Sequence, residues 1–151
     1  MLNYISSPLI SVRTKAKSKK RVIEELLGLF VKTKDIGKKY ANDVCKAVLK
    51  RETLGSTGIG NGIALPHVRH KKIKKIKMAF ANSVDGIEFN SLDAEPVHIV
   101  FLLIGPEKSG REYTQVLSEL AQYLNDPYFR RDLLAAEAKK DVLAAIRKKD
   151  E

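Results

Sequence analysis

The stretch from Arg51 to His70 collects residue types that suit phosphate chemistry. Arg51 opens it with a planar, permanently charged guanidinium that fits phosphate oxygens. His67 stands near its end and offers an imidazole nitrogen that is substantially neutral at pH 7. Between them lie four of the chain's nine glycines, at positions Gly55, Gly58, Gly60 and Gly62. A cation, a glycine-rich segment and an imidazole are the parts that phosphoryl transfer through a phosphohistidine needs.

The glycine-rich segment suggests where the oxygens of a phosphoryl group would bind. Glycines let the backbone approach a ligand closely, and successive N–H groups in such turns can converge on an anion. We therefore take the small polar and glycine positions as candidate phosphate-binding residues: Ser56, Thr57, Gly58, Gly60 and Asn61. The spacing matches neither GxxxxGK[ST] nor GxGxxG. A glycine-rich surface loop that happens to carry a histidine is an equal alternative on residue chemistry alone.

A metal site is a second alternative, because His67 and His70 are three residues apart. Structural zinc sites use four ligands, and catalytic sites use three and a water. The sequence offers no evident third ligand, since its one cysteine, Cys45, falls in a separate helical pattern. We therefore expect neither a metal nor another cofactor.

Length and composition favour one soluble domain over residues 1–151. Hydrophobic residues make up 44% and charged residues 30%, which suits a core and a solvated surface. The longest strongly apolar run, from Val97 to Ile104, is far shorter than a membrane span. The N-terminus lacks the pattern of a signal peptide, and a single cysteine suits a reducing compartment. We expect a cytoplasmic protein without membrane insertion, and composition leaves its oligomeric state open.

The net charge of +10 raises the question of an acidic partner, a nucleic acid or a lysine-rich solvated surface. The cations concentrate in two runs, Arg13 to Arg21 and Arg69 to Lys77. Aromatic residues do not alternate with either run, so a stacking surface for single-stranded nucleic acid is not indicated. We expect no nucleic-acid partner, and a solvated surface is the simplest explanation.

The N-terminal third predicts a short strand and two helices. The strand spans Pro8 to Val12, and Ser18 is a suitable N-cap for the helix that follows. That helix carries apolar residues at helical spacing: Val22, Ile23, Leu26, Leu27 and Phe30. Gly37 interrupts the pattern, and a second helix runs from Tyr40 to Lys50. Arg51 would then lie at a helix C-terminus, which is favourable for a cation.

The middle of the chain predicts strands. Residues 62–65 should be extended because they precede Pro66, which would then present His67 rigidly at a strand end. Alternation over residues 76–80 favours a half-buried strand, and Asp85-Gly86 is a turn signal. Residues 97–104 are almost all apolar and predict a central strand covered on both faces. His98 lies in that strand and is interpreted as structural.

The C-terminal third predicts helices. Ser109 and Glu112 have the spacing of a capping box, which would open a helix that carries Tyr113 in its first turn. Asp126-Pro127 is an N-cap followed by proline at the first helical position. Residues 142–146 indicate a last helix. The whole pattern predicts an α/β fold, a mixed β-sheet flanked by helices on both faces.

The stretch RETLGSTGIGNGIALPH closely resembles the active-site signature of enzyme IIA (EIIA) of the fructose/mannitol type, a component of the bacterial sugar phosphotransferase system. The resemblance is greatest to the nitrogen-regulatory branch. It extends to KAKSKKRVIEELLGLF, to EPVHIVFLLIGPE and to LSELAQYLNDPYFRRDLLAAE, which are similar to the family's first helix, central strand and C-terminal helices. The resemblance implies that His67 carries the phosphoryl group and that Arg51 assists.

The resemblance also implies partners. A small histidine phosphocarrier protein (HPr-like) would donate the phosphoryl group, which would pass to a cysteine of an EIIB domain or act as a regulatory signal on a target protein. The chain departs from the family at Tyr113, where members usually carry a second histidine. A tyrosine hydroxyl forms hydrogen bonds but takes no positive charge, so we group Tyr113 with the phosphate-binding residues. A non-catalytic binding module of the same fold is the alternative function.

Overall fold

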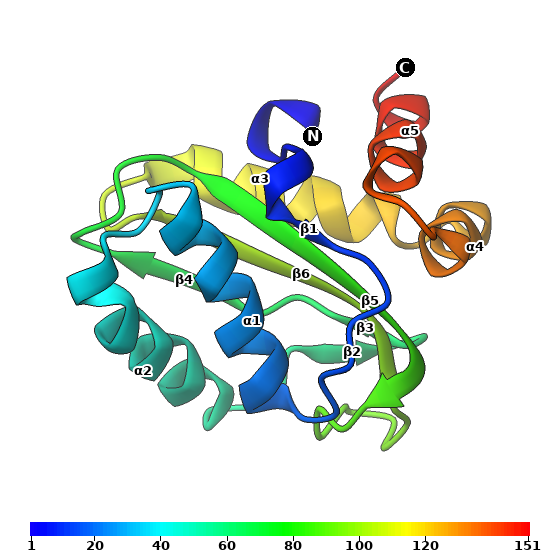
Figure 1. Ribbon diagram of the computed structural model, residues 1–151, viewed down its shortest axis with the longest axis horizontal. Coiled ribbons are helices and arrows are strands. Elements are labelled where there is room, and N and C mark those ends of the chain that lie inside the picture. The colour runs from blue at the N-terminus through cyan, green and yellow to red at the C-terminus, as the bar shows by residue number, and fades with distance from the viewer.

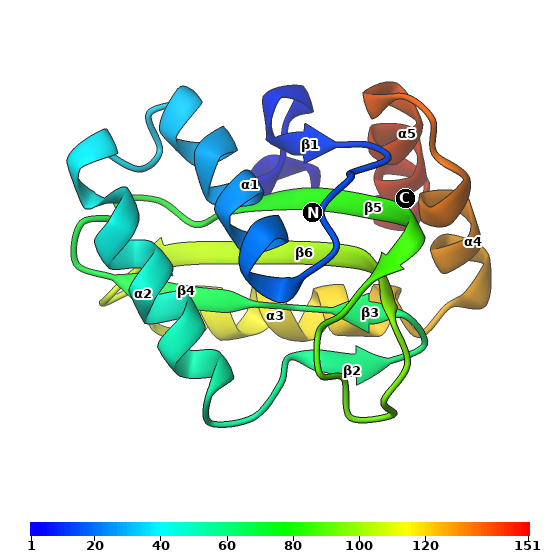
Figure 2. The same cartoon turned by 60° about the horizontal axis from the view of Figure 1, so that its bottom comes forward.

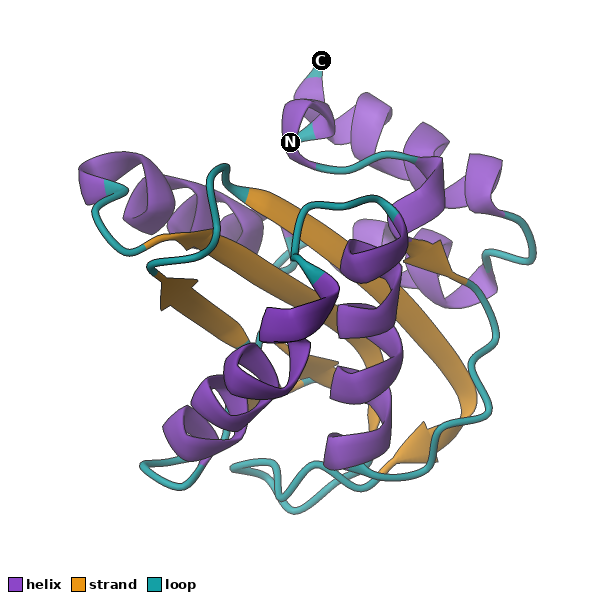
Figure 3. Ribbon diagram, turned by 60° about the vertical axis from the view of Figure 1, so that its left-hand side comes forward, coloured by secondary structure: helices purple, strands orange, loops and turns teal.

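The computed structural model describes all residues from Met1 to Glu151 and shows one mixed sheet of six strands between two helical layers (Figure 1). Helices α1 (Lys19–Lys32) and α2 (Ala41–Glu52) cover one face, and α3 (Gly110–Tyr123) lies on the other (Figure 2). Figure 3 shows the same sandwich from the side of α1 and α2. The predicted α/β fold, with helices on both faces of a mixed sheet, is confirmed.

The strands are β1 (Ile10–Ser11), β2 (Gly58–Gly60), β3 (Ile63–Ala64), β4 (His67–His70), β5 (Lys77–Ile87) and β6 (Val97–Pro106). Their order across the sheet is β1-β5-β6-β3-β2, and β4 also pairs with β6. Strand β5 is antiparallel to β6, whereas β3 and β4 are parallel to it. The predicted central strand is thus confirmed as β6, which is buried over almost its whole length.

Strands β3 and β4 are two parts of one extended segment that Pro66 interrupts. Ile63 lies opposite Ile99 and His67 lies opposite Leu103, so both parts keep the same offset against β6. The Pro66 carbonyl still accepts a hydrogen bond from Leu103 N–H at 3.0 Å. Proline lacks an N–H, which removes one bond from the ladder without shifting the register. This segment carries His67 into the sheet.

The C-terminal helices close the fold at the end of the sheet away from α2. Helix α4 (Pro127–Ala135) packs on β5 and β6, and α5 (Lys139–Asp150) packs on β1 and the first turn of the chain. The predicted N-caps at Ser18 and Asp126 are confirmed: each side chain accepts a hydrogen bond from a backbone N–H in the first turn. Phe80 and Phe101 meet edge to face at 5.1 Å in the core.

Strand β5 differs from its predicted form in two respects. Residues 78–83 are all buried, because helices cover both faces, so the strand is not half-buried. Asp85-Gly86 is not a turn: β5 runs on to Ile87, with a shift of register between Asn82 and Ile87. Gly86 has φ of +98°, a conformation that serves an irregularity inside a strand as well as it serves a turn.

Two expected local structures were wrong. The segment Pro8–Val12 is mostly not a strand: a 3-10 turn at Ser7–Leu9 precedes the two-residue β1, because proline suits a first helical turn. The capping box at Ser109 is absent. The Ser109 backbone is in the α region instead of the extended region that an N-cap needs, and its hydroxyl donates to the Pro106 carbonyl.

Candidate active site around His67

A cavity of about 450 Å³ lies beside β4, between α2 and α3. Its lining comes from these three elements: Ala47, Arg51, His67, Val68, Arg69, Tyr113, Thr114 and Leu117. A larger hollow of about 650 Å³ beside the start of α1 is lined mainly by charged side chains and contains no imidazole. The fold therefore brings together three predicted site residues, Arg51, His67 and Tyr113, from three separate elements.

The His67 imidazole is held in one tautomer. Its Nδ1 lies 2.8 Å from the Leu65 carbonyl oxygen, which can only accept, so Nδ1 carries the proton and donates. The other ring nitrogen, Nε2, then keeps its lone pair. The ring is half-buried, and Pro66 restricts the backbone just before it. A neutral imidazole with its lone pair on Nε2 is a competent nucleophile.

Arg51 lies in the last turn of α2, as predicted, and lines the cavity. One Nη1–H donates to the Gly55 carbonyl at 2.9 Å, and no other hydrogen bond or ion pair holds the guanidinium. Most of its N–H donors are therefore free for an anion. The C-terminal end of α2 carries partial negative charge, which favours the cation at this position.

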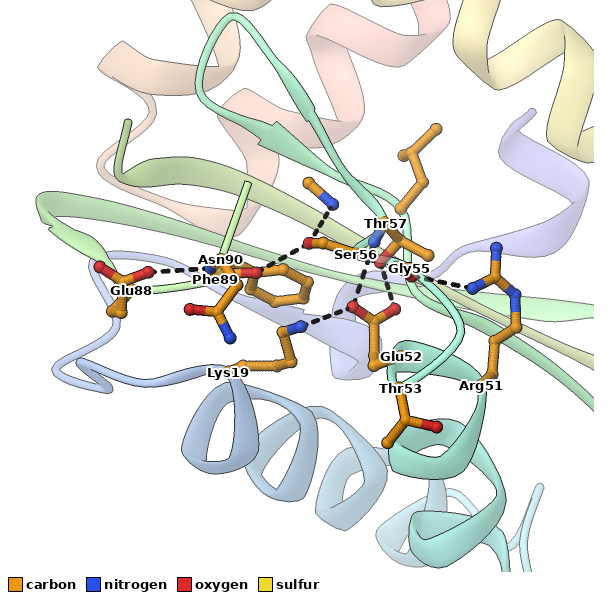
Figure 4. Close-up of polar contacts among 12 residues, drawn as sticks. Lys19, Arg51, Glu52, Thr53, Gly55, Ser56, Thr57, Glu88, Phe89 and Asn90 are labelled. Atoms are coloured by element: carbon orange, nitrogen blue, oxygen red, sulfur yellow. Dashed lines mark hydrogen bonds and ion pairs between the residues drawn. The ribbon is translucent and has the colours of Figure 1, made fainter. Parts of the chain in front are cut away.

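The neighbouring residue, Glu52, fastens the loop that follows α2 (Figure 4). Its buried carboxylate accepts hydrogen bonds from Thr57 N–H at 3.1 Å and from Thr57 Oγ1 at 2.6 Å. The ammonium of Lys19 lies 2.9 Å from Glu52 Oε1 and 4.9 Å from the centre of the Phe89 ring. This network joins the start of α1 to the end of α2, and so fixes the base from which Arg51 projects.

The structure places the candidate phosphate-binding residues Ser56, Thr57, Gly58, Gly60 and Asn61 outside the lining of the cavity. Ser56 Oγ donates to the Phe89 carbonyl and accepts from Gly58 N–H (Figure 4). A Cβ at Gly58 would stand 3.0 Å from Ser91 Cα. Gly60, Asn61 and Gly62 have positive φ in the turn between β2 and β3. Close packing and a tight turn thus account for much of the glycine content.

Tyr113 stands in the first turn of α3 with its ring centre 6.3 Å from that of His67. Only 4% of the residue is exposed, and its hydroxyl is buried without a hydrogen-bond partner. Burial raises the pKa of the Tyr113 hydroxyl well above its ordinary value, although the nearby charges of Arg69 and Arg51 act in the opposite direction. The phenol therefore remains protonated at any physiological pH.

Arg69 is a cavity residue that sequence reasoning assigned only to a basic run. It follows His67 by two positions on β4, so both side chains project to the same side. Its Cζ lies 4.5 Å from the centre of the Tyr113 ring, and Nη2 donates to Thr114 Oγ1 at 3.1 Å. The two-residue spacing from His67 was the signal that could have found it.

The other two histidines lie elsewhere. His70 Nδ1 accepts from Lys72 N–H, so its Nε2 carries the proton that bonds Asp43 at 2.5 Å and holds the pKa of that carboxyl below its ordinary value. Three positions along a strand reverse the face, so His67 and His70 cannot share a metal ion. His98 Nδ1 donates to the Ser83 carbonyl at 2.8 Å.

One imidazole and two guanidinium groups thus line a single cavity of an α/β domain. Residues 3–149 match the family described as "Phosphoenolpyruvate-dependent sugar phosphotransferase system, EIIA 2". The chain belongs to this family. None of its helices is long and apolar enough to cross a membrane.

The relatives include fructose-specific EIIA components and a nitrogen regulatory protein. The chain is 37% identical over 142 residues to the fructose-specific EIIA component of Haloferax volcanii, covering 91% of this chain and 90% of the relative. It is 33% identical to the fructose-specific EIIABC component of Bacillus subtilis, of which it spans 22%. The structure of the nitrogen regulatory protein IIA-Ntr of Neisseria meningitidis superimposes with a TM-score of 0.86 at 31% identity, covering 95% of this chain and 97% of that one.

Proposed function

We propose that this protein is a phosphoryl carrier and that His67 Nε2 accepts the phosphoryl group from a small histidine phosphocarrier protein (HPr-like). The observation that carries the proposal is the hydrogen bond between Nδ1 and the Leu65 carbonyl, because it leaves the lone pair on Nε2. Phosphoryl transfer depends mainly on positioning and on electrostatic stabilisation. A single fixed tautomer supplies the first requirement without any movement of the ring.

The transfer step needs no net proton movement. The Nε2 lone pair attacks phosphorus, the new N–P bond forms, and the N–P bond of the donor phosphohistidine breaks, so that its electron pair returns to the donor imidazole. The proton on His67 Nδ1 stays in its bond to the Leu65 carbonyl. Passing the group to a thiolate of an EIIB domain follows the same pattern, with an S–P bond formed.

The charge around the cavity supports an anionic group. Arg51 presents free N–H donors, and the capping side chain of Ser109 is turned away from the start of α3. The N-terminus of α3 therefore keeps unsatisfied N–H groups and partial positive charge in the turn that carries Tyr113. Of these donors, those of Arg51 line the cavity and can hold the equatorial oxygens during transfer.

The relatives support two fates for the phosphoryl group. The name of the Bacillus relative joins EIIA to B and C components, which supports an EIIB domain as the acceptor. The similarity to the Neisseria nitrogen regulatory protein supports retention of the group as a signal read by a target protein. Both fates require the same first step at His67. A non-catalytic binding module of this fold would lack that step.

Labelling by a phosphorylated carrier tests the proposal. His67→Ala and His67→Gln should fold, as judged by circular dichroism, yet take no phosphoryl group by mass spectrometry. Folded His98→Ala and His70→Ala should still gain an acid-labile phosphoryl group, because neither imidazole lines the cavity. Label on folded His67→Ala would exclude His67 as the acceptor. A wild-type chain that takes no label from any phosphocarrier would favour the binding module.

A further inference from the structure

The Tyr113 hydroxyl is one of only two buried side-chain polar atoms without a hydrogen-bond partner. A buried polar group left unpaired is costly to a fold, and native structures keep few of them. The other such atom, Ser91 Oγ, lies in the loop against Gly58 and outside the cavity. Tyr113 lines the cavity beside the proposed nucleophile, so its unmet hydrogen bond points to a ligand.

The sheet holds the Tyr113 ring firmly in this position. Arg69 of β4 and Gly105 of β6 are direct neighbours in the sheet, and the ring contacts both. A Cβ at Gly105 would stand 2.7 Å from Tyr113 Cδ2, so only glycine leaves room for the ring. The guanidinium of Arg69 lies over the ring and is itself tied to Thr114. The phenol is therefore preorganised rather than loosely packed.

We propose that the Tyr113 hydroxyl donates a hydrogen bond to the phosphoryl group on His67, and that Arg69 acts as the positioning residue for the phenol ring. This inference rests on the proposed function. The ring centres of His67 and Tyr113 are 6.3 Å apart with their planes tilted by 58°, and both residues line the same cavity. A phosphoryl oxygen would supply the acceptor that the buried hydroxyl lacks.

The chemistry of a phenol suits this task. It gives a hydrogen bond without adding charge, and burial raises its pKa so that it keeps its proton. Arg51 and Arg69 supply the positive charge around it. No proton moves from Tyr113 during transfer.

Tyr113→Phe removes the hydroxyl alone and gives the sharpest test. With the phosphorylated carrier as probe, the equilibrium constant for phosphoryl exchange onto this chain should fall about 10- to 100-fold, the usual worth of a hydrogen bond to a charged group. The unphosphorylated variant should melt about 2–4 °C higher than wild type, because it loses an unsatisfied buried group. A tyrosine that served only the fold would give the opposite sign in the melting experiment.

Tyr123→Phe is the matched control, because it makes the same change on the same helix. The Tyr123 hydroxyl lies 2.9 Å from Glu119 Oε1 and 2.7 Å from Asp150 Oδ1, away from the cavity. This variant should melt at a lower temperature and keep the wild-type exchange equilibrium. The two tyrosine variants should therefore change stability in opposite directions, and only Tyr113→Phe should change phosphoryl exchange.

A double-mutant cycle tests the role of Arg69. Arg69→Gln should weaken exchange in the wild-type background and have a clearly smaller effect in Tyr113→Phe, because it acts through the phenol. Equal effects in both backgrounds would remove the positioning role. If wild type labels on His67 and Tyr113→Phe exchanges like wild type, the inference is wrong although the proposed function stands. If wild type never labels, both fail together.

Discussion

The loop that follows α2 and the cavity beside β4 treat their polar groups in opposite ways. In the loop, the Glu52 carboxylate is engaged by Thr57 and by Lys19, and the Ser56 hydroxyl is engaged by Phe89. In the cavity, the Tyr113 hydroxyl has no partner and Arg51 has one. Glu52 and Arg51 are adjacent in the chain, yet one belongs to each region.

The hydrogen-bonded loop supports the fold, whereas the unpaired polar groups of the cavity are available to a ligand. A fully satisfied buried network rigidifies its surroundings, whereas an unsatisfied donor raises the energy of the empty state and lowers it when an acceptor arrives. The hydrogen bonds of the loop therefore fix the end of α2, from which Arg51 projects. In the cavity, Arg69 is bonded to Thr114, whereas the Tyr113 hydroxyl and most of the Arg51 donors stay unpaired. Substitutions in the two regions should accordingly change different measurements.

The largest effect should come from breaking the loop network. Glu52→Ala leaves the Lys19 ammonium and the Thr57 hydroxyl without their partner, and Lys19 is largely buried. The free energy of unfolding should fall by about 3 kcal/mol in urea titrations. Asp85→Ala, which breaks the exposed pair with Lys17, is the control and should leave stability unchanged. Equal effects would mean that Glu52 does not hold the loop.

The next effect should appear in the cavity. Arg51→Lys keeps the charge but loses the planar fork, so phosphoryl transfer from the carrier should slow by about 10- to 100-fold, or about 1.4–2.7 kcal/mol. Stability should barely change, because the only bond lost is the one to the Gly55 carbonyl. Stopped-flow or quench-flow transfer rates measure this. Transfer at the wild-type rate would remove Arg51 from the site.

A third prediction concerns Gly105, the residue of β6 that packs against the Tyr113 ring. Gly105→Ala places a methyl group against the ring and should destabilise the fold by about 1–2 kcal/mol, with slower transfer as the phenol shifts. Gly28→Ala in α1 meets no atom within 4 Å and should instead stabilise by about 0.5–1 kcal/mol. Thermal or urea unfolding of both variants gives the comparison. Equal stability changes in Gly105→Ala and Gly28→Ala would show that the fold accommodates a methyl group at position 105 without cost.

Alkaline pH should weaken the fold through its tyrosines. Burial raises the pKa of Tyr113 and Tyr123 in the folded state, and hydrogen bonds to the carboxylates of Asp150 and Glu119 raise that of Tyr123 further, so the folded chain holds these protons more tightly than the unfolded chain. Their contribution is complete below about pH 10, the unfolded value, and is lost as pH rises above it. Melting temperatures measured from pH 8 to pH 11 should fall at the upper end. Tyr113→Phe should show a smaller fall than wild type.

The smallest effect should come from the basic run Arg69–Lys77. Lys72, Lys74 and Lys75 line an exposed hollow around Tyr40, beyond the end of β4. Lys74→Gln with Lys75→Gln should slow association with the carrier a few-fold at low salt, and the difference should vanish at physiological salt. Lys140→Gln on α5 is the control. An association rate that does not respond to salt would leave these lysines as a solvated edge.

The sequence was most informative where local rules decide the structure. The apolar run at Val97 and the N-caps at Ser18 and Asp126 predicted β6 and two helix starts, because each depends on a few neighbouring residues. The same rules failed at Ser109 and Gly86. There the backbone conformation follows from packing of β6 and α3 or from the pairing of β5, which no local pattern records.

The lining of the cavity was predictable in part for the same reason. His67 and Arg51 stand in a motif whose residue types indicate phosphate chemistry. The candidate phosphate-binding glycines beside them lie outside the cavity lining, and at Gly58 close packing on Ser91 also requires glycine. The place of Arg69 in the cavity depends on the contact between its guanidinium on β4 and the Tyr113 ring on α3. Contacts between elements distant in the chain decide such residues.

The unbroken offset of β3 and β4 against β6 has a consequence for how this segment can vary in length. Side chains alternate faces along a strand, so the side that His67 occupies is a matter of odd and even counting from Ile63. Inserting or deleting a single residue around Pro66 would turn the imidazole away from the side of the sheet that it shares with Arg69. A point substitution here changes one side chain, whereas a one-residue change of length moves every later side chain of β4 to the opposite face.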